Sequence, residues 1–138
     1  MPEALLLDTC AALWLMNKAR MSPASLDRIR AAQRDGSGVH VSPISAWEVA
    51  TLVAKGRISL AYEPEVWFES LLALPGIRLA DMSPAVLMRS AFLPGEPPND
   101  PADRILAATA REHEQALVTR DGALLRYGEA GHLTVVAC

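Results

Sequence analysis

Five short apolar runs, separated by longer segments of helical period, constrain the fold of this chain most strongly. The runs lie at residues 4–7, 39–41, 77–79, 116–119 and 133–137. Short apolar strands that alternate with helices are typical of a parallel sheet covered on both faces. We therefore predict an α/β fold, a three-layer α/β/α sandwich around a mainly parallel sheet of four or five strands.

Capping residues predict where the helices begin and end. Serine before proline at Ser22 and Ser83, and an acid before proline at Glu63 and Asp100, mark four helix starts. The predicted helices cover residues 11–18, 23–35, 42–54, 64–74, 84–92 and 101–114. Residues 93–100 contain three prolines and a glycine, so they are predicted to form a surface loop or lid.

Length and composition exclude several classes of protein. The 138 residues fit one domain, residues 1–138. The chain is 51% hydrophobic and 21% charged, with no apolar run near the ~20 residues of a membrane span, so it is predicted to be globular, without a membrane association. The first apolar stretch meets Asp8 without a basic segment before it, which predicts a cytoplasmic protein without a signal peptide. The spacing of Cys10 and Cys138 argues against a disulfide scaffold and a zinc site.

Three acidic residues follow predicted strands, at the edge where functional groups of parallel sheets collect. Asp8 directly follows the first run, Asp121 comes two residues after the fourth, and Glu48 lies early in the helix after the second. Each has a structural explanation on its own. Asp8 and Asp121 can cap helices, and Ser45 with Glu48 matches a capping box. Glu48 shares its helix face with aliphatic side chains, however, and a carboxylate there needs a cation, a donor or a proton.

Two further acids open the helix predicted at residues 101–114. Asp100 precedes proline and fits the N-cap, whereas Asp103 falls at the third helical position. Both acids suit the positive end of a helix, so a structural role is the alternative for each.

Four clustered carboxylates would require raised pKa values or a bound cation. The candidates are Asp8, Glu48, Asp103 and Asp121. Oxygen ligands without histidine or cysteine favour Mg²⁺ or Mn²⁺. Such an ion activates water and stabilises charge on a phosphate under attack, so phosphodiester hydrolysis is the predicted reaction class.

Four segments of the chain, taken in order, resemble the PIN-domain nucleases, and among them the VapC-like toxins of bacterial toxin–antitoxin pairs. The segments are LLLDTCAAL, VSPISAWEVATLVAKGRI, DPADRILAATA and LVTRDGALLRY. The resemblance implies endoribonuclease activity on RNA, a Mg²⁺ or Mn²⁺ site, a small antitoxin partner and a homodimer.

The resemblance also implies roles for individual residues. Asp8, Glu48, Asp103 and Asp121 match the catalytic and metal-binding acids of the family, and Thr9, Ser45 and Thr119 match the small hydroxyl residues beside them. The chain departs from many similar toxins at Ala102, where they carry an aromatic residue, and this leaves the shape of the pocket open.

Other reactive or aromatic residues are predicted to have supporting roles. The candidates for phosphate contacts are Arg104, Arg120, Lys55 and Arg57, with a general surface role as the alternative. The residues expected in the core or at interfaces are Cys10, Trp14, Trp47 and Trp67. No catalytic role is predicted for His40, His113 or His132.

Three alternative functions remain open from the sequence. A nuclease of RNA processing or DNA repair would have the same acids. A signalling receiver domain also presents an acid after a strand, but an acidic pair after the first strand is missing here. A catalytically silent binding module is disfavoured because all four acids are present.

Overall fold

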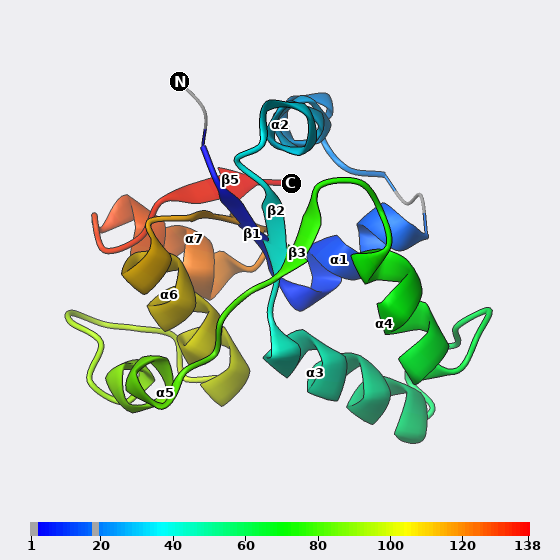
Figure 1. Ribbon diagram of the computed structural model, residues 1–138. Helices are drawn as coiled ribbons and strands as arrows, with labels where there is room; N and C mark the ends of the chain where they lie inside the picture. Colours follow the sequence, from blue (N-terminus) through cyan, green and yellow to red (C-terminus); the bar gives the residue numbers. More distant parts are fainter. Residues whose placement is uncertain (1–2, 18–19) are drawn as a thin grey trace.

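Strand β1 (Leu5–Leu7) consists of three fully buried leucines and forms the centre of the sheet. The computed structural model describes residues 3–17 and 20–138. Around β1 lie β2 (Val39–Val41), β3 (Ile77–Leu79), β4 (Ala116–Thr119) and β5 (Val135–Ala137), in the order β3-β2-β1-β4-β5. All four pairings are parallel, with Leu7 opposite Val41 on one side and Val118 on the other. The predicted α/β sandwich with a parallel sheet is confirmed (Figure 1).

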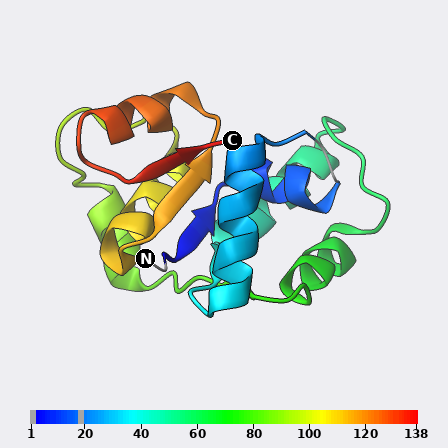
Figure 2. The same ribbon diagram turned by 90° about the horizontal axis from the view of Figure 1, so that it is seen from above.

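Alternation along β1 sends its side chains into two separate cores, because successive residues of a strand face opposite sides of the sheet. Leu5 and Leu7 pack with α1 (Thr9–Met16), α2 (Pro23–Asp35), α3 (Pro43–Ala54) and α4 (Pro64–Leu72). Leu6 packs with α6 (Pro101–His113) and α7 (Gly122–Glu129), and α5 (Pro84–Ser90) lies against α6. The view from above shows these two helical layers on opposite sides of the sheet (Figure 2).

Most predicted boundaries agree with the structure, and the differences have local causes. Helix α1 begins at Thr9, two residues earlier than predicted, because the Asp8 carboxylate caps it by accepting from the Ala11 amide at 2.7 Å. The predicted end of this helix, Lys18, lies outside the described residues. Helix α4 ends at Leu72, α5 at Ser90 and α6 at His113, and β5 begins only at Val135.

Helix α7 was not among the predicted helices. Its sequence, GALLRYGE, contains Gly122 and Gly128, and glycine is a poor helix former. The apolar side chains Leu124 and Tyr127 are buried and hold the helix against the sheet. Tertiary packing therefore decides its conformation, against its local propensity.

The segment at residues 93–100 is a loop, as predicted, with neither helix nor strand. The hydroxyl of Tyr127 anchors it by donating to the carbonyl of Pro94 at 2.6 Å. Across residues 3–17 and 20–138, none of the helices is both long and apolar enough to cross a bilayer. Both cysteines are free thiols.

Candidate functional site

Three of the four predicted acids lie at helix N-termini, and the fourth, Glu48, lies one turn farther along its helix. Asp8 caps α1 after β1, and Asp121 caps α7 after β4. Glu48 lies in the second turn of α3, and Asp103 is the third residue of α6. Since the carboxyl ends of parallel strands share one edge, segments distant in sequence meet there.

Asp8 is the most enclosed of the four acids, with only 5% of its surface exposed. Its Oδ1 accepts the Ala11 amide, and its Oδ2 accepts the Thr119 hydroxyl at 2.6 Å. That hydroxyl in turn accepts the amide of Asp121 at 3.0 Å. Burial raises the pKa of Asp8, against the lowering effect of these hydrogen bonds. The carboxylate is therefore fixed in orientation by donors from α1 and β4, and burial disfavours its charged form.

Glu48 is linked to α1 through two hydroxyl groups. Thr9 Oγ1 donates to Glu48 Oε1 at 2.5 Å, and the Thr9 and Ser45 hydroxyls lie 2.9 Å apart. Thr9 has a single proton, so with Glu48 ionised the Ser45 hydroxyl is the donor to Thr9. Burial is the main cause that raises the pKa of Glu48, and Asp100 and Asp8 add to it.

The capping box of Ser45 and Glu48 is wrong as an explanation of these residues. Helix α3 begins at Pro43, and the side chain that caps it is Ser42, which accepts from the amide of Ile44 at 3.1 Å. Ser45 therefore lies inside the helix, where its hydroxyl is free for Thr9. The Ser42-Pro43 pair, the same signal as at the other serine-capped helices, could have predicted this start.

Asp103 has the largest pKa shift among the four acids. Burial, followed by the charges of Asp100, Asp121, Glu48 and Asp8, raises its pKa to about 7. Asp100 is exposed and caps α6 by accepting the Asp103 amide at 2.9 Å, as predicted. The two acids of this segment thus differ as the sequence predicted, since one caps the helix and the other faces the remaining carboxylates.

Asp121 is the most accessible acid of the group. Its Oδ2 caps α7 by accepting the amide of Leu124 at 3.0 Å, while the side chain as a whole is exposed. The capping role suggested for Asp121 and Asp8 is therefore real, and it occupies only part of the acceptor capacity of each carboxylate.

The four acids influence one another electrostatically, although they do not form a ready-made cage. The charges of the other three acids help to raise the pKa of Asp103, and the charge of Asp121 helps to raise the pKa of Asp8. Over the described part of the chain, no three Asp, Glu, His or Cys side chains are arranged to hold one metal ion as they stand. The arrangement can take up protons or a cation, because either relieves the repulsion.

Two of the basic residues proposed for phosphate contacts instead hold the fold together. The Arg104 guanidinium donates to the carbonyls of Ser90, Ala91 and Pro98 at 2.9 to 3.2 Å. Arg120 donates to the carbonyls of Arg20 and Cys138 and lies over the ring of Trp14, 4.0 Å from its centroid.

The other two cations, Lys55 and Arg57, are exposed at the end of α3. They keep the phosphate-binding role as a prediction, since their charges face solvent. A sequence pattern could not distinguish these two exposed cations from Arg104 and Arg120. The carbonyls that accept hydrogen bonds from Arg104 and Arg120 come from other segments of the chain.

Cys10 was predicted to be a core residue, and this is wrong, because its side chain is exposed. The thiol is still partly enclosed, and this partial burial, followed by the charges of the nearby Asp8, Glu48 and Asp103, raises its pKa to about 11. The thiolate is the reactive form of cysteine, so these surroundings do not activate Cys10 as a nucleophile.

The tryptophans divide into three situations. Trp67 is 2% exposed and belongs to the core as predicted, and Trp14 stacks on Arg120. Trp47 is 62% exposed, so it does not belong to the core. Its position directly before Glu48 was the sequence signal that Trp47 lies near the candidate acids.

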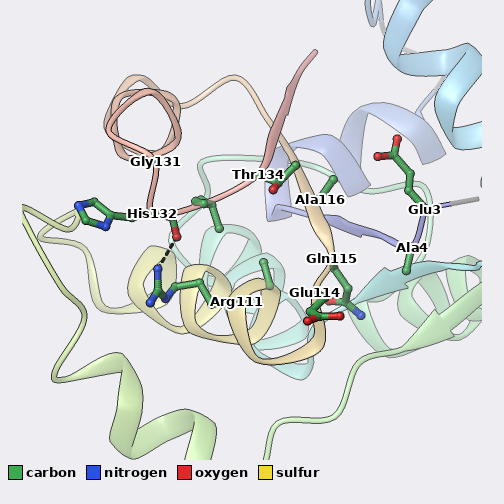
Figure 3. A pocket seen from close by; sticks show the side chains of 11 residues that line it. Glu3, Ala4, Arg111, Glu114, Gln115, Ala116, Gly131, His132 and Thr134 are labelled. Carbon is green, nitrogen blue, oxygen red and sulfur yellow. Dashed lines mark hydrogen bonds between the residues drawn. The ribbon is translucent and has the colours of Figure 1, made fainter. Parts of the chain in front are cut away.

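A hollow of about 440 Å³ lies at the opposite end of the sheet, where β1 and β4 begin (Figure 3). Its lining includes Glu114, Gln115 and Arg111, and Arg111 donates to the carbonyl of His132. None of the four predicted acids contributes to it. The chemistry of the chain therefore points to the carboxylate edge rather than to this hollow.

Comparison with known proteins agrees with this geometry. The family model of the PIN domain matches residues 5–130. Ribonuclease VapC22 of Mycobacterium tuberculosis (strain ATCC 25618 / H37Rv) is 34% identical over 131 residues, which are 94% of this chain and 96% of that protein.

Solved structures with the same fold include VapBC2 from Rickettsia felis bound to a promoter DNA fragment. It has a TM-score of 0.69 and 15% identity, and the match covers 97% of this chain and 98% of the other. FitAcB from Neisseria gonorrhoeae matches with a TM-score of 0.56 and 22% identity, over 95% of both chains.

Proposed function

The chain belongs to the PIN-domain family, and we propose that it is a Mg²⁺- or Mn²⁺-dependent endoribonuclease that acts as the toxin of a toxin–antitoxin pair. The observation that carries the proposal is the convergence of four carboxylates from four separate elements; at Asp103, burial and then the charges of Asp100 and the other three acids raise the pKa to about 7. A ribonuclease of 34% identity over nearly the whole chain supports RNA as the substrate.

The residues present fit a hard divalent cation. All four side chains offer carboxylate oxygens, which Mg²⁺ and Mn²⁺ prefer. The raised pKa values of Asp8, Glu48 and Asp103 mean that these groups take up protons more readily than free carboxyl groups do, and a cation would compete with those protons. We propose Asp8, Glu48, Asp103 and Asp121 as the ligands. When bound, such an ion lowers the pKa of water and stabilises charge on the phosphate.

The surrounding hydroxyl groups position these acids. Thr119 holds Asp8 Oδ2 and receives the Asp121 amide, so it keeps two of the acids in a fixed relation. Thr9 holds Glu48 in the same way from α1. Because the carboxylates are already oriented, little ordering remains when the scissile phosphate and a water molecule bind between them. Asp121 is the exposed member of the four and would be the first of them to meet an entering substrate.

Two partners complete the proposal. A small antitoxin would hold the toxin inactive, as the resemblance to the VapC-like toxins implies, and solved structures of this fold include VapBC assemblies. Two copies of the chain would form a homodimer, and this dimer would act on RNA in the cytoplasm.

Cleavage of RNA by the purified chain tests the nuclease. We expect cleavage of single-stranded RNA with Mg²⁺ or Mn²⁺, none with EDTA, and none with the Glu48→Gln variant of unchanged melting temperature. Activity that persists in EDTA would refute the metal dependence, and cleavage of DNA instead of RNA would support a repair nuclease.

Expression in a growing bacterium tests the toxin role separately. Growth arrest by the chain, relieved by the small protein from the adjacent reading frame, is the expected result. An active ribonuclease that does not arrest growth would indicate a role in RNA processing.

A further inference from the structure

Trp47 is the exposed aromatic side chain directly before the acid Glu48. It is 62% exposed, whereas Trp67 is 2% exposed and the Trp14 ring is covered by Arg120. Exposed apolar residues need no special explanation where they are scattered over a surface. Trp47 differs from such scattered residues because it lies beside the candidate acid Glu48.

Helix geometry determines on which side of α3 the indole lies. Successive residues of a helix are turned by about 100°, so Trp47 and Glu48 point in different directions from adjacent positions. Ile44, one turn before Trp47 and close to it around the helix, packs into the core that contains Leu106 and Ala107 of α6. The indole therefore stands on the α6 side of α3, and the first turn of α6 carries Asp103.

The indole thus lies toward the helix that carries Asp103, one residue before Glu48. Glu48 comes from α3 and Asp103 from α6, and the charge of Glu48 contributes to the raised pKa of Asp103. A polymer bound with one phosphate at these carboxylates would extend its neighbouring groups over the adjoining surface of α3. Trp47 is the exposed aromatic side chain of that helix.

Farther along α3 the exposed side chains are first small and then basic. Ala50 and Ala54 continue the exposed face of Trp47, and Lys55 and Arg57 follow at the end of the helix. Lys55 comes seven residues after Glu48, so it lies on the same side of the helix and about 10 Å farther along it. An aromatic platform followed by cations, beside a hydrolytic site, is the pattern that single-stranded nucleic acid requires.

The same surface is less suited to a protein partner. The centre of a protein interface combines several large apolar side chains in one patch. The exposed neighbours of Trp47 on α3 are alanines, and the cations beyond them are the residues that phosphates attract. The larger exposed side chains Met88 and Phe92 lie on and after α5.

We propose that Trp47 stacks on a base of the RNA substrate next to the phosphate that is cleaved, and that Lys55 contacts a phosphate farther along the strand. This inference depends on the proposed ribonuclease function. It makes Trp47 a substrate-binding residue, which acts on affinity and on the choice of cleavage position.

The test compares Trp47→Ala and Trp47→Phe with the control Phe92→Ala, which removes an aromatic ring that is 86% exposed near the far end of α6. Steady-state cleavage of a short single-stranded RNA is measured with Mn²⁺. Base stacking on an aromatic ring predicts a KM increase of about 5- to 150-fold for Trp47→Ala, with kcat unchanged within about twofold. Trp47→Phe retains most of the affinity, and Phe92→Ala matches the wild type.

An RNA that lacks single bases beside the mapped cleavage site gives a readout specific to stacking. At one position, loss of the base should weaken binding to the wild type but not to Trp47→Ala. A Trp47→Ala variant that cleaves with wild-type KM overturns the stacking while the ribonuclease function stands. A variant whose molar mass by light scattering falls to half that of the wild type assigns Trp47 to an interface between copies, which also overturns it. A wild-type chain that cleaves no RNA overturns both proposals.

Discussion

Replacing Asp103 or Asp100 by asparagine separates a charge-bearing site residue from a helix cap. The acids lie three residues apart, and Asp100 accepts the amide of Asp103 at 2.9 Å. Asparagine caps a helix about as well as aspartate, so Asp100→Asn should change the unfolding free energy by only a few tenths of a kcal/mol. Its cleavage activity should remain near that of the wild type.

Asp103→Asn should instead stabilise the metal-free protein and inactivate it. The Asp103 pKa lies at about 7 in the folded protein, against an ordinary value of 3.8. Each unit is worth about 1.4 kcal/mol, so a fully enclosed group would cost about 4 kcal/mol when ionised. Asp103 is partly open to solvent, which screens its charge, and asparagine lacks the favourable interaction with the helix dipole. We therefore expect a gain of about 1 to 2 kcal/mol at pH 8.

The pH dependence gives this prediction its sign. A carboxyl whose pKa is raised by folding contributes stability below its unfolded pKa and loses it as pH rises through the folded value. The stability of the wild type relative to Asp103→Asn should therefore fall between about pH 4 and pH 7. Urea unfolding in EDTA at pH 4 and pH 8 measures both differences, and RNA cleavage should drop more than about 100-fold in Asp103→Asn alone. An Asp100→Asn variant that is inactive beside an active Asp103→Asn variant would refute the assignment.

Three further perturbations test the site and its supports. Glu48→Gln should abolish Mg²⁺-dependent cleavage while circular dichroism stays unchanged, and full activity would remove Glu48 from the site. Mn²⁺ should raise the melting temperature of the wild type, because binding to the native state stabilises it by about 2.7 kcal/mol at 100 times the dissociation constant, and the rise should be smaller in Glu48→Gln. Arg120→Ala should cost about 1 to 3 kcal/mol in urea unfolding through its lost contacts with Arg20, Cys138 and Trp14, whereas RNA cleavage of the folded variant should change little if Arg120 serves the fold.

The strands and most helix starts could be predicted because their signals are local. Ser22-Pro23 and Asp100-Pro101 place the caps of α2 and α6 in the positions that the structure shows. Helix α7 was missed because its glycines weaken the helical signal, and its stability comes from Leu124 and Tyr127 against the sheet. Packing between segments distant in sequence is what a local pattern leaves undetermined.

The same limit applies to the site. The positions of Asp8, Glu48 and Asp121 could be predicted because each follows a strand of the parallel sheet, whereas Asp103, in a helix that follows a loop, was singled out by the family resemblance. The hydrogen bonds of Arg104 and Arg120 could not be predicted, since their acceptors include the carbonyls of Ser90 and Cys138 in other parts of the chain. Cys10 was predicted to be buried because the segment around it is apolar, but it lies on the exposed side of α1, near the acids.

The occupied arginines change how RNA would be held. A chain with net charge −3 attracts RNA only through a local concentration of cations, and the two arginines nearest to the acids in sequence donate to backbone carbonyls. The exposed cations Lys55 and Arg57 lie about two helical turns beyond Glu48. Binding would then depend on a track along α3, with stacking beside the acids and phosphate contacts beyond them. Such binding should weaken only moderately with salt, because the slope of affinity against salt reflects the few phosphates neutralised.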